Sequence, residues 1–136
     1  LAAEEHGFEV SDYEMRRGGK SYSFYTVGYF SELYPDDELF LLVGSDMFLS
    51  FDKWFRFEDI LKKVTLSVIS RQDDDTELLK KKAGELQIYG STEVVDVPAY
   101  PVSSTQIRNM IKTNENFSCY LPEKVVQYIR LKNLYK

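Results

Sequence analysis

The chain alternates short apolar runs with longer segments in which apolar residues recur at helical spacing. Residues 38–44 are almost continuously apolar, a pattern typical of a central parallel strand that is covered on both faces. Residues 8–17 alternate weakly, with Val10, Tyr13 and Met15 as their only clear apolar anchors, and are also expected to form a strand. The strands predicted in this way are residues 8–17, 38–44, 65–70 and 94–97.

The segments between and after these strands predict helices, because their apolar residues are three or four positions apart. Ser21 is the expected N-cap of the first complete one, and the run from Lys80 to Lys82 is expected to be a solvated helix face. The predicted helices are residues 22–34, 47–51, 58–63, 76–86 and 122–131, one that begins at Ser103 or Ser104, and the last turns of one over residues 1–6 that ends at Gly7. Strands that alternate with helices predict an α/β fold with a doubly wound parallel sheet.

The composition is that of a globular protein, with 43% hydrophobic residues in a chain of 136. This length suits one domain over residues 1–136 and is too short for two comfortable ones. The net charge of -5 repels polyanions, so nucleic acid is not an expected partner, and no apolar run is long enough to predict a membrane span. The single cysteine, Cys119, cannot form an internal disulfide, which favours a reducing, cytoplasmic location.

A stretch that follows two prolines carries the first candidate chemistry. The prolines exclude a helix before it, while Ser103, Ser104 and Thr105 can cap a helix that begins there. The first N–H groups of a helix lack intrahelical acceptors and suit an anion, and Arg108 has a side chain long enough to reach back to them. The stretch therefore fits either a phosphate site or an ordinary N-cap followed by a solvated arginine.

Two more candidates follow the apolar run of residues 38–44. Gly44 and Asp46 come where an open parallel sheet places its ligands, at the carboxyl end of a strand. Asp46 can also serve as the N-cap of the next helix, and the two roles are compatible. Trp54 lies in a dense aromatic loop, where composition favours a core position and the functional alternative is a flat surface on which a ring stacks.

No metal site is predicted from the residues alone. The run Asp73-Asp74-Asp75 consists of consecutive side chains, which rarely converge on one ion, and is expected to be a polar loop. The single histidine, His6, has no acid or nucleophile pattern around it and is expected at the surface or in a cap.

Five short blocks extend these observations. They are residues 21–26 (Ser-Tyr-Ser-Phe-Tyr-Thr), 43–46 (Val-Gly-Ser-Asp), 51–54 (Phe-Asp-Lys-Trp), 102–108 (Val-Ser-Ser-Thr-Gln-Ile-Arg) and 120–122 (Tyr-Leu-Pro). In this order and spacing they resemble bacterial nicotinate-nucleotide adenylyltransferases of the nucleotidyltransferase superfamily. The end of the chain, residues 125–135, continues the resemblance, which covers nearly the whole sequence.

The resemblance implies a Rossmann-like nucleotidyltransferase fold and adenylyl transfer from ATP to nicotinate mononucleotide in NAD biosynthesis, with help from Mg²⁺. It implies that Arg108 is the catalytic residue and that Ser103, Ser104, Thr105 and Arg108 bind the ATP phosphates.

The resemblance also implies a subsite for nicotinate mononucleotide. Trp54 matches the residue that stacks on the nicotinate ring, and Phe55 follows it where a backbone N–H meets the pyridine carboxylate. Ser23 stands at a position, commonly threonine, that approaches the same carboxylate. Gly44 and Asp46 match the turn that contacts the nucleotide, with Asp46 expected on a ribose hydroxyl.

One part of the family pattern has no counterpart. The opening glycine-rich strand and the His-x-Gly-His motif are not found, so the chain is expected to be the carboxyl-terminal part of an adenylyltransferase and catalytically poor by itself. In this fold the first strand lies beside residues 39–43, so an unpaired apolar edge is expected there, through which two copies can associate.

Three alternatives stay open. The first two are adenylyltransferases that act on nicotinamide mononucleotide or on phosphopantetheine, although phosphopantetheine has no ring to stack on Trp54. The third is a mononucleotide-binding chain that is catalytically incomplete.

Overall fold

The computed structural model describes residues 1–3, 7–70, 76–97 and 102–135. Contacts between residues divide the chain into two compact units, of which the larger is Tyr13–Ala99 and the smaller combines Leu1–Asp12 with Tyr100–Lys136. Each unit has its own hydrophobic core. The helix expected over residues 1–6 falls partly, and the loop expected at residues 73–75 wholly, outside the described residues.

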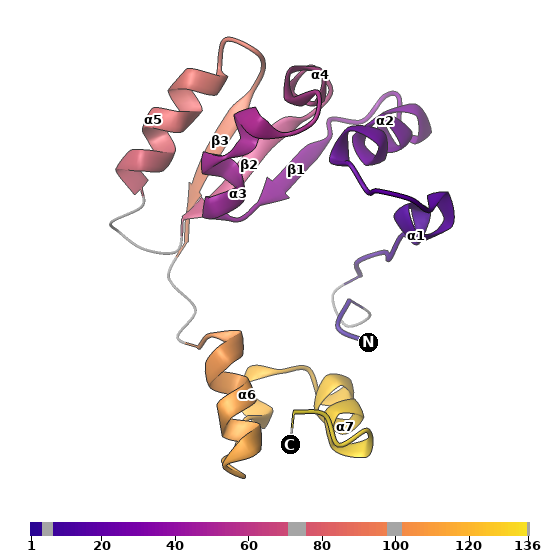
Figure 1. Cartoon of the computed structure of the whole chain (residues 1–136), viewed down its shortest axis with the longest axis vertical. Helices are drawn as coiled ribbons and strands as arrows, with labels where there is room; N and C mark the ends of the chain where they lie inside the picture. The colour runs from indigo at the N-terminus through magenta and orange to yellow at the C-terminus, as the bar shows by residue number, and fades with distance from the viewer. Residues whose placement is uncertain (4–6, 71–75, 98–101, 136) are drawn as a thin grey trace. The chain divides into compact units, whose positions relative to one another are not determined.

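A three-stranded parallel sheet forms the centre of the larger unit (Figure 1). Its strands are β1 (Phe40–Val43), β2 (Thr65–Ser70) and β3 (Thr92–Asp96), joined by α3 (Ser45–Leu49), the 3-10 helix η2 (Phe51–Lys53), α4 (Phe57–Leu61) and α5 (Thr76–Leu86). β2 lies between β1 and β3 and pairs in parallel with both. α5 packs on β2 and β3, and α3 packs on β2 and α5. This arrangement confirms the α/β fold with a parallel sheet.

β1 lies at one edge of the described sheet, so the prediction of a central strand covered on both faces is wrong for these residues. Leu41 and Val43 pack against the core, whereas Phe40 and Leu42 are 57% and 59% exposed. Successive side chains of a strand point to opposite faces, and one face of β1 has no covering element in the described ranges. The edge of β1 that points away from β2 has no partner strand in the described ranges, as the family resemblance implied.

The strand predicted for residues 8–17 is wrong. Residues 8–12 are in neither a helix nor a strand, and helix α1 covers Tyr13–Arg17. Val10 and Met15 are 82% and 85% exposed, so the apolar positions of this segment do not form a buried face. A weak alternation without a partner strand does not produce a strand, because strand formation depends on cross-strand packing.

The start of helix α2 (Ser23–Leu33) also differs from the prediction. Its N-cap is Tyr22, which makes no side-chain cap hydrogen bond, and not Ser21. The Glu14 carboxylate accepts hydrogen bonds from the hydroxyls of Ser21 and Thr26. These two bonds, of which the Ser21 bond has the larger effect, lower the pKa of Glu14 below its usual value. The Ser21 hydroxyl therefore links α1 to the segment just before α2 instead of capping α2.

A close backbone approach fixes the turn before β3. A Cβ atom at Gly90 would lie 2.1 Å from the carbonyl oxygen of Leu61, so only a glycine fits beside the end of α4. The fully buried side chains around this sheet include Phe48, Phe51, Leu66 and Leu79. Phe51 belongs to η2, so the turn that precedes Trp54 is anchored in the core.

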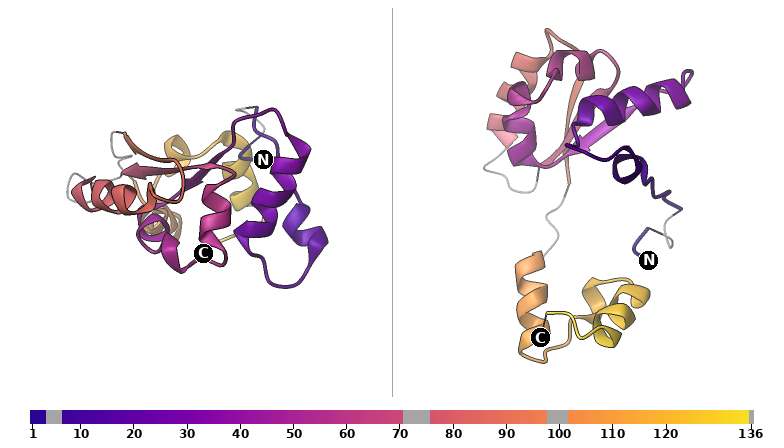
Figure 2. Two further views of the ribbon diagram at one scale, coloured as in Figure 1. Left: turned by 90° about the horizontal axis from the view of Figure 1, so that it is seen from above. Right: turned by 45° about the vertical axis from the view of Figure 1, so that its right-hand side comes forward.

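The described part of the smaller unit contains α6 (Ser104–Lys112), the 3-10 helix η3 (Ser118–Tyr120) and α7 (Glu123–Leu131) (Figure 2). Its core consists of Ile111, Phe117, Val126 and Ile129. The two helices predicted here are confirmed, with Ser103 and Pro122 as their N-caps. Across the described ranges, none of the helices combines the length and apolar character that a membrane crossing requires.

Candidate active site

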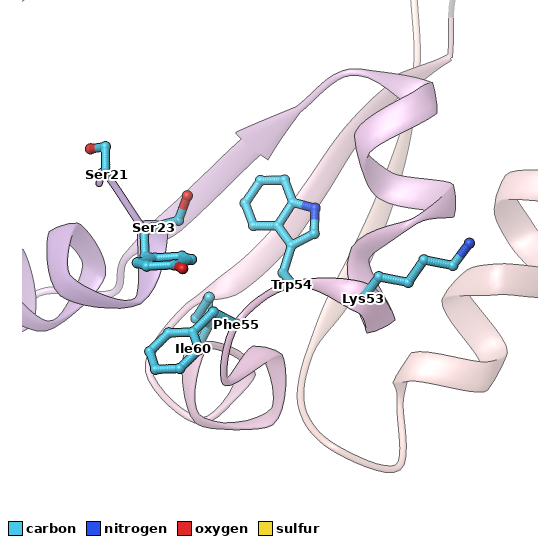
Figure 3. A pocket seen from close by; sticks show the side chains of 7 residues that line it. Ser21, Ser23, Lys53, Trp54, Phe55 and Ile60 are labelled. Carbon is cyan, nitrogen blue, oxygen red and sulfur yellow. The ribbon is translucent and has the colours of Figure 1, made fainter. Parts of the chain in front are cut away.

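A pocket of the larger unit lies between the N-terminal end of α2 and the loop that follows η2. Figure 3 shows Ser21 and Ser23 on one side of the Trp54 ring, while the Lys53 side chain extends away from that ring. Tyr22, Phe55 and Ile60 complete the lining. The pocket thus brings together three residues that the resemblance assigns to nicotinate mononucleotide, namely Ser23, Trp54 and Phe55.

Trp54 combines the two positions that the sequence left open. Its ring packs on the buried ring of Phe51, with centroids 4.8 Å apart and planes inclined by 37°. Its backbone N–H donates to the Phe51 carbonyl oxygen at 2.9 Å. The indole is only partly buried and also lines the pocket, so part of its surface is available to a flat ligand.

Tyr22 is a pocket residue that sequence reasoning missed. Its ring centroid lies 4.7 Å from that of Phe55, and the Lys20 ammonium lies 4.9 Å above the Tyr22 ring. Phe55 itself is 45% exposed. Tyr22 stands in a block that the resemblance quotes, but its sequence position does not reveal that α2 and the Trp54 loop meet.

The loop after Phe55 turns sharply at Arg56, which has a φ of 55° in the left-handed region. This residue is held from two sides, because its Nε atom donates to Asp59 at 2.8 Å and its guanidinium lies 4.2 Å above the Phe24 ring. Hydrogen bonds from Lys62, which has the larger effect, and from Arg56 lower the pKa of the Asp59 carboxyl. These contacts hold the backbone at the point where a non-glycine residue adopts an unfavourable conformation.

The turn after β1 differs in detail from the prediction. Gly44 is the N-cap of α3, so Asp46 is not the N-cap but an exposed residue in the first turn. Neither Gly44 nor Asp46 lines the pocket around Trp54. Between them, the Ser45 hydroxyl oxygen is buried and has no hydrogen-bond partner within the part of the chain that the structure describes.

The predicted phosphate residues lie in the smaller unit, at the start of α6. Ser103 and Gln106 form a capping box: the Gln106 N–H donates to the Ser103 hydroxyl at 3.2 Å, and the Ser103 N–H donates to Gln106 Oε1 at 2.7 Å. Arg108 Nη2 donates to the Thr105 hydroxyl at 3.3 Å. Ser104, Thr105 and Arg108 are exposed. This helix start therefore has the features of an ordinary N-cap followed by a solvated arginine, which is one of the two interpretations that the sequence left open.

Within the described ranges, no three histidine, cysteine, aspartate or glutamate side chains gather in an arrangement that could hold a metal ion.

Residues 1–110 match the family described as cytidylyltransferase-like. A probable nicotinate-nucleotide adenylyltransferase of Clostridium tetani is 35% identical over 135 residues, which cover 98% of this chain and 68% of that protein. A protein of the same description from Thermotoga maritima is 41% identical over 121 residues, which cover 86% of this chain and 56% of the relative. The chain thus spans from just over half to about two thirds of the length of these relatives.

The fold is shared with solved structures of lower identity. Plasmodium falciparum nicotinic acid mononucleotide adenylyltransferase complexed with APC superposes with a TM-score of 0.61 at 18% identity, over 87% of this chain and 60% of that chain. The same enzyme complexed with NaAD gives a TM-score of 0.59 over 85% of this chain. The order of the sequence blocks, the parallel sheet and these matches agree, and the chain belongs to the cytidylyltransferase-like family, among its nicotinate-nucleotide adenylyltransferases.

Proposed function

We propose that this chain provides the nicotinate mononucleotide subsite and part of the ATP phosphate site of an enzyme that transfers an adenylyl group from ATP to nicotinate mononucleotide. The observation that carries the proposal is the convergence of Ser23, Trp54 and Phe55 on one pocket. Ser23 and Trp54 come from two separate sequence blocks that resemble the family, and Phe55 directly follows the second block. Their meeting in one pocket supports the proposal.

In this proposal the nicotinate ring stacks on the exposed part of the Trp54 indole, and its carboxylate approaches Phe55 and Ser23. The Phe55 N–H has no hydrogen-bond acceptor among the described residues, so it is available as a donor. The Ser23 hydroxyl is a second donor. A carboxylate accepts from both groups, whereas a carboxamide would direct its own N–H donors toward them. The subsite therefore favours nicotinate over nicotinamide mononucleotide.

The turn after β1 offers polar groups for the rest of the nucleotide. We assign Gly44 and Asp46 to this role, with the Asp46 carboxylate accepting from a ribose hydroxyl. The Ser45 hydroxyl lies in the same turn and has no hydrogen-bond partner among the described residues, so a ligand atom that reached it would satisfy a buried polar group. Nothing in the sequence distinguished Ser45 from an ordinary residue of a helix start.

We assign the ATP phosphates to the start of α6. The capping box leaves the N–H groups of Ser104 and Thr105 without an intrahelical acceptor, and the helix dipole favours an anion there. Arg108 is exposed and can leave the Thr105 hydroxyl to bind a phosphate through two parallel hydrogen bonds. ATP enters as its Mg²⁺ complex, in which the metal offsets phosphate charge.

The reaction is a displacement at the α-phosphorus of ATP. A phosphate oxygen of nicotinate mononucleotide forms the new P–O bond as the bond to pyrophosphate breaks, which yields nicotinic acid adenine dinucleotide. The protein's part is to align the two anions and to stabilise the charge that builds on the departing pyrophosphate, and Arg108 is the residue that we assign to that charge.

Titration with nicotinate mononucleotide tests the pocket assignment. Trp54 is the single tryptophan of the chain, so its fluorescence reports on this site alone. We expect saturable quenching by nicotinate mononucleotide, weaker binding of nicotinamide mononucleotide, and no quenching by ribose 5-phosphate, which has no ring. A folded sample whose fluorescence does not respond to nicotinate mononucleotide would contradict the stacking assignment.

A further inference from the structure

Lys82 does not behave like the rest of its lysine run. The run from Lys80 to Lys82 predicts a solvated face, and the Lys80 side chain is indeed 62% exposed. The Lys82 side chain is only 14% exposed, because it turns toward η2 and places its Nζ atom 3.0 Å from Asp52 Oδ1. A second carboxylate, that of Glu85, lies 3.5 Å from the same ammonium. The prediction of a solvated face is therefore wrong for Lys82.

The ion pair joins two elements with different roles. α5 is fixed in the core by Leu79 and Leu86, which are 0% and 2% exposed. Asp52 lies in the middle of η2, between the buried Phe51 and the chain that leads to Trp54. The Trp54 backbone N–H donates to the Phe51 carbonyl oxygen, so the orientation of η2 determines where the Cα atom of Trp54, and with it the indole ring, lies.

Both partners of the pair are held in their charged forms. The hydrogen bond from Lys82 is the main cause that lowers the pKa of the Asp52 carboxyl. Burial opposes the charge on Lys82, but hydrogen bonds and charges of Asp52 and Glu85 together outweigh burial and raise the pKa of its ammonium. The contact is thus a charged hydrogen bond over a wide range around neutral pH, and such bonds are stronger than neutral ones.

We propose that Lys82 is a positioning residue of the nicotinate mononucleotide subsite, which acts by holding Asp52 and thereby the Trp54 platform. Phe51 anchors η2 in the core, and η2 also packs on α3 and α4. The Lys82–Asp52 contact adds a charged tie from η2 to a third helix, α5, at the residue two positions before Trp54. The identity of the ligand rests on the proposed function, but the link between Lys82 and the Trp54 ring does not.

The experiment compares Lys82→Met with Lys80→Met. Both variants remove an ammonium from α5 and keep an unbranched stem, and the Lys80 ammonium forms an ion pair with Glu77 at 3.6 Å within its own helix. We expect Lys82→Met to raise the Kd for nicotinate mononucleotide about fivefold, near the upper end of what a partly exposed ion pair contributes, and to leave the Kd for ATP unchanged. We expect Lys80→Met to change neither Kd, and Lys82→Arg to restore most of the lost affinity.

A measurement without ligand separates this inference from the proposed function. In the free protein, Lys82→Met is expected to shift the emission of Trp54 and to increase its quenching by acrylamide, and Lys80→Met is not. Asp52→Leu removes the acceptor at a similar side-chain size and gives the same readout if Lys82→Met fails to fold. Unchanged emission in a folded Lys82→Met or Asp52→Leu protein, or an equal change in Lys80→Met, overturns the positioning role. Failure of wild-type protein to bind nicotinate mononucleotide refutes the proposed function while the emission comparison still decides the role of Lys82.

Discussion

Replacing Arg108 with alanine is expected to slow adenylyl transfer by about 2 to 4 kcal/mol of transition-state stabilisation, which is about 30- to 900-fold in rate. The reason is that negative charge builds on the phosphates as pyrophosphate leaves, and a guanidinium that meets it with two hydrogen bonds stabilises that charge more than the ground state. The measurement is kcat/KM for ATP in a protein that carries this chain together with the family's opening strand and His-x-Gly-His motif.

The controls for this prediction come from the same helix. Lys112 lies in the last turn of α6, so Lys112→Ala removes a positive charge far from the proposed phosphate position and is expected to change the rate little. Arg108→Lys keeps the charge but loses the planar fork, so it should fall between wild type and Arg108→Ala. A rate for Arg108→Ala equal to that of wild type would remove Arg108 from the ATP site.

Replacing Trp54 with alanine is expected to weaken nicotinate mononucleotide binding by about 1 to 3 kcal/mol, the range found when an aromatic platform under a nucleobase is removed. The Kd for ATP should change little, because ATP is assigned to other residues. Isothermal titration calorimetry is the appropriate measurement, since this variant has no tryptophan to report binding.

Two variants control for the loss of a ring. Trp54→Phe keeps an aromatic surface and should retain an intermediate affinity. Tyr34→Ala removes an exposed aromatic side chain that stacks on Phe30, outside the pocket, and should leave the affinity unchanged. Equal affinities for wild-type protein and a folded Trp54→Ala variant would show that the ring binds elsewhere.

The sequence predicted those elements whose pattern is determined by their own residues. Residues 65–70 and 76–86 match β2 and α5 at both ends, because each has a continuous pattern that its burial then enforces. The start of α6 follows from local chemistry, since a serine cap and a glutamine three residues later form a capping box without help from the rest of the chain.

The predictions that proved wrong concern residues whose structure depends on distant parts of the chain. Residues 8–17 have the alternation of a strand but no partner strand in the described ranges, and the residues of β1 are apolar whether or not a neighbour covers them. Ser21 bonds to Glu14 and Lys82 to Asp52, so neither shows the role that its local pattern predicts.

The candidate site divides in the same way. Trp54, Phe55 and Ser23 were found through the family resemblance, and the structure brings them to one pocket. Tyr22 and Ser45 were missed because the folded chain alone creates the ring contact of Tyr22 and buries the Ser45 hydroxyl without a partner among the described residues. The roles of Ser103, Ser104, Thr105, Arg108 and Asp46 stay predictions that binding and rate measurements can test.

The most direct test of the proposed function follows the adenylyl group itself. ATP labelled at the α-phosphate is incubated with a protein that carries this chain together with the family's opening strand and His-x-Gly-His motif. Parallel samples contain nicotinate mononucleotide, nicotinamide mononucleotide or phosphopantetheine. The proposal predicts that label enters a dinucleotide fastest with nicotinate mononucleotide, with release of one pyrophosphate for each dinucleotide formed. Label transfer that is faster with nicotinamide mononucleotide or phosphopantetheine, or that occurs with none of the three, would contradict it.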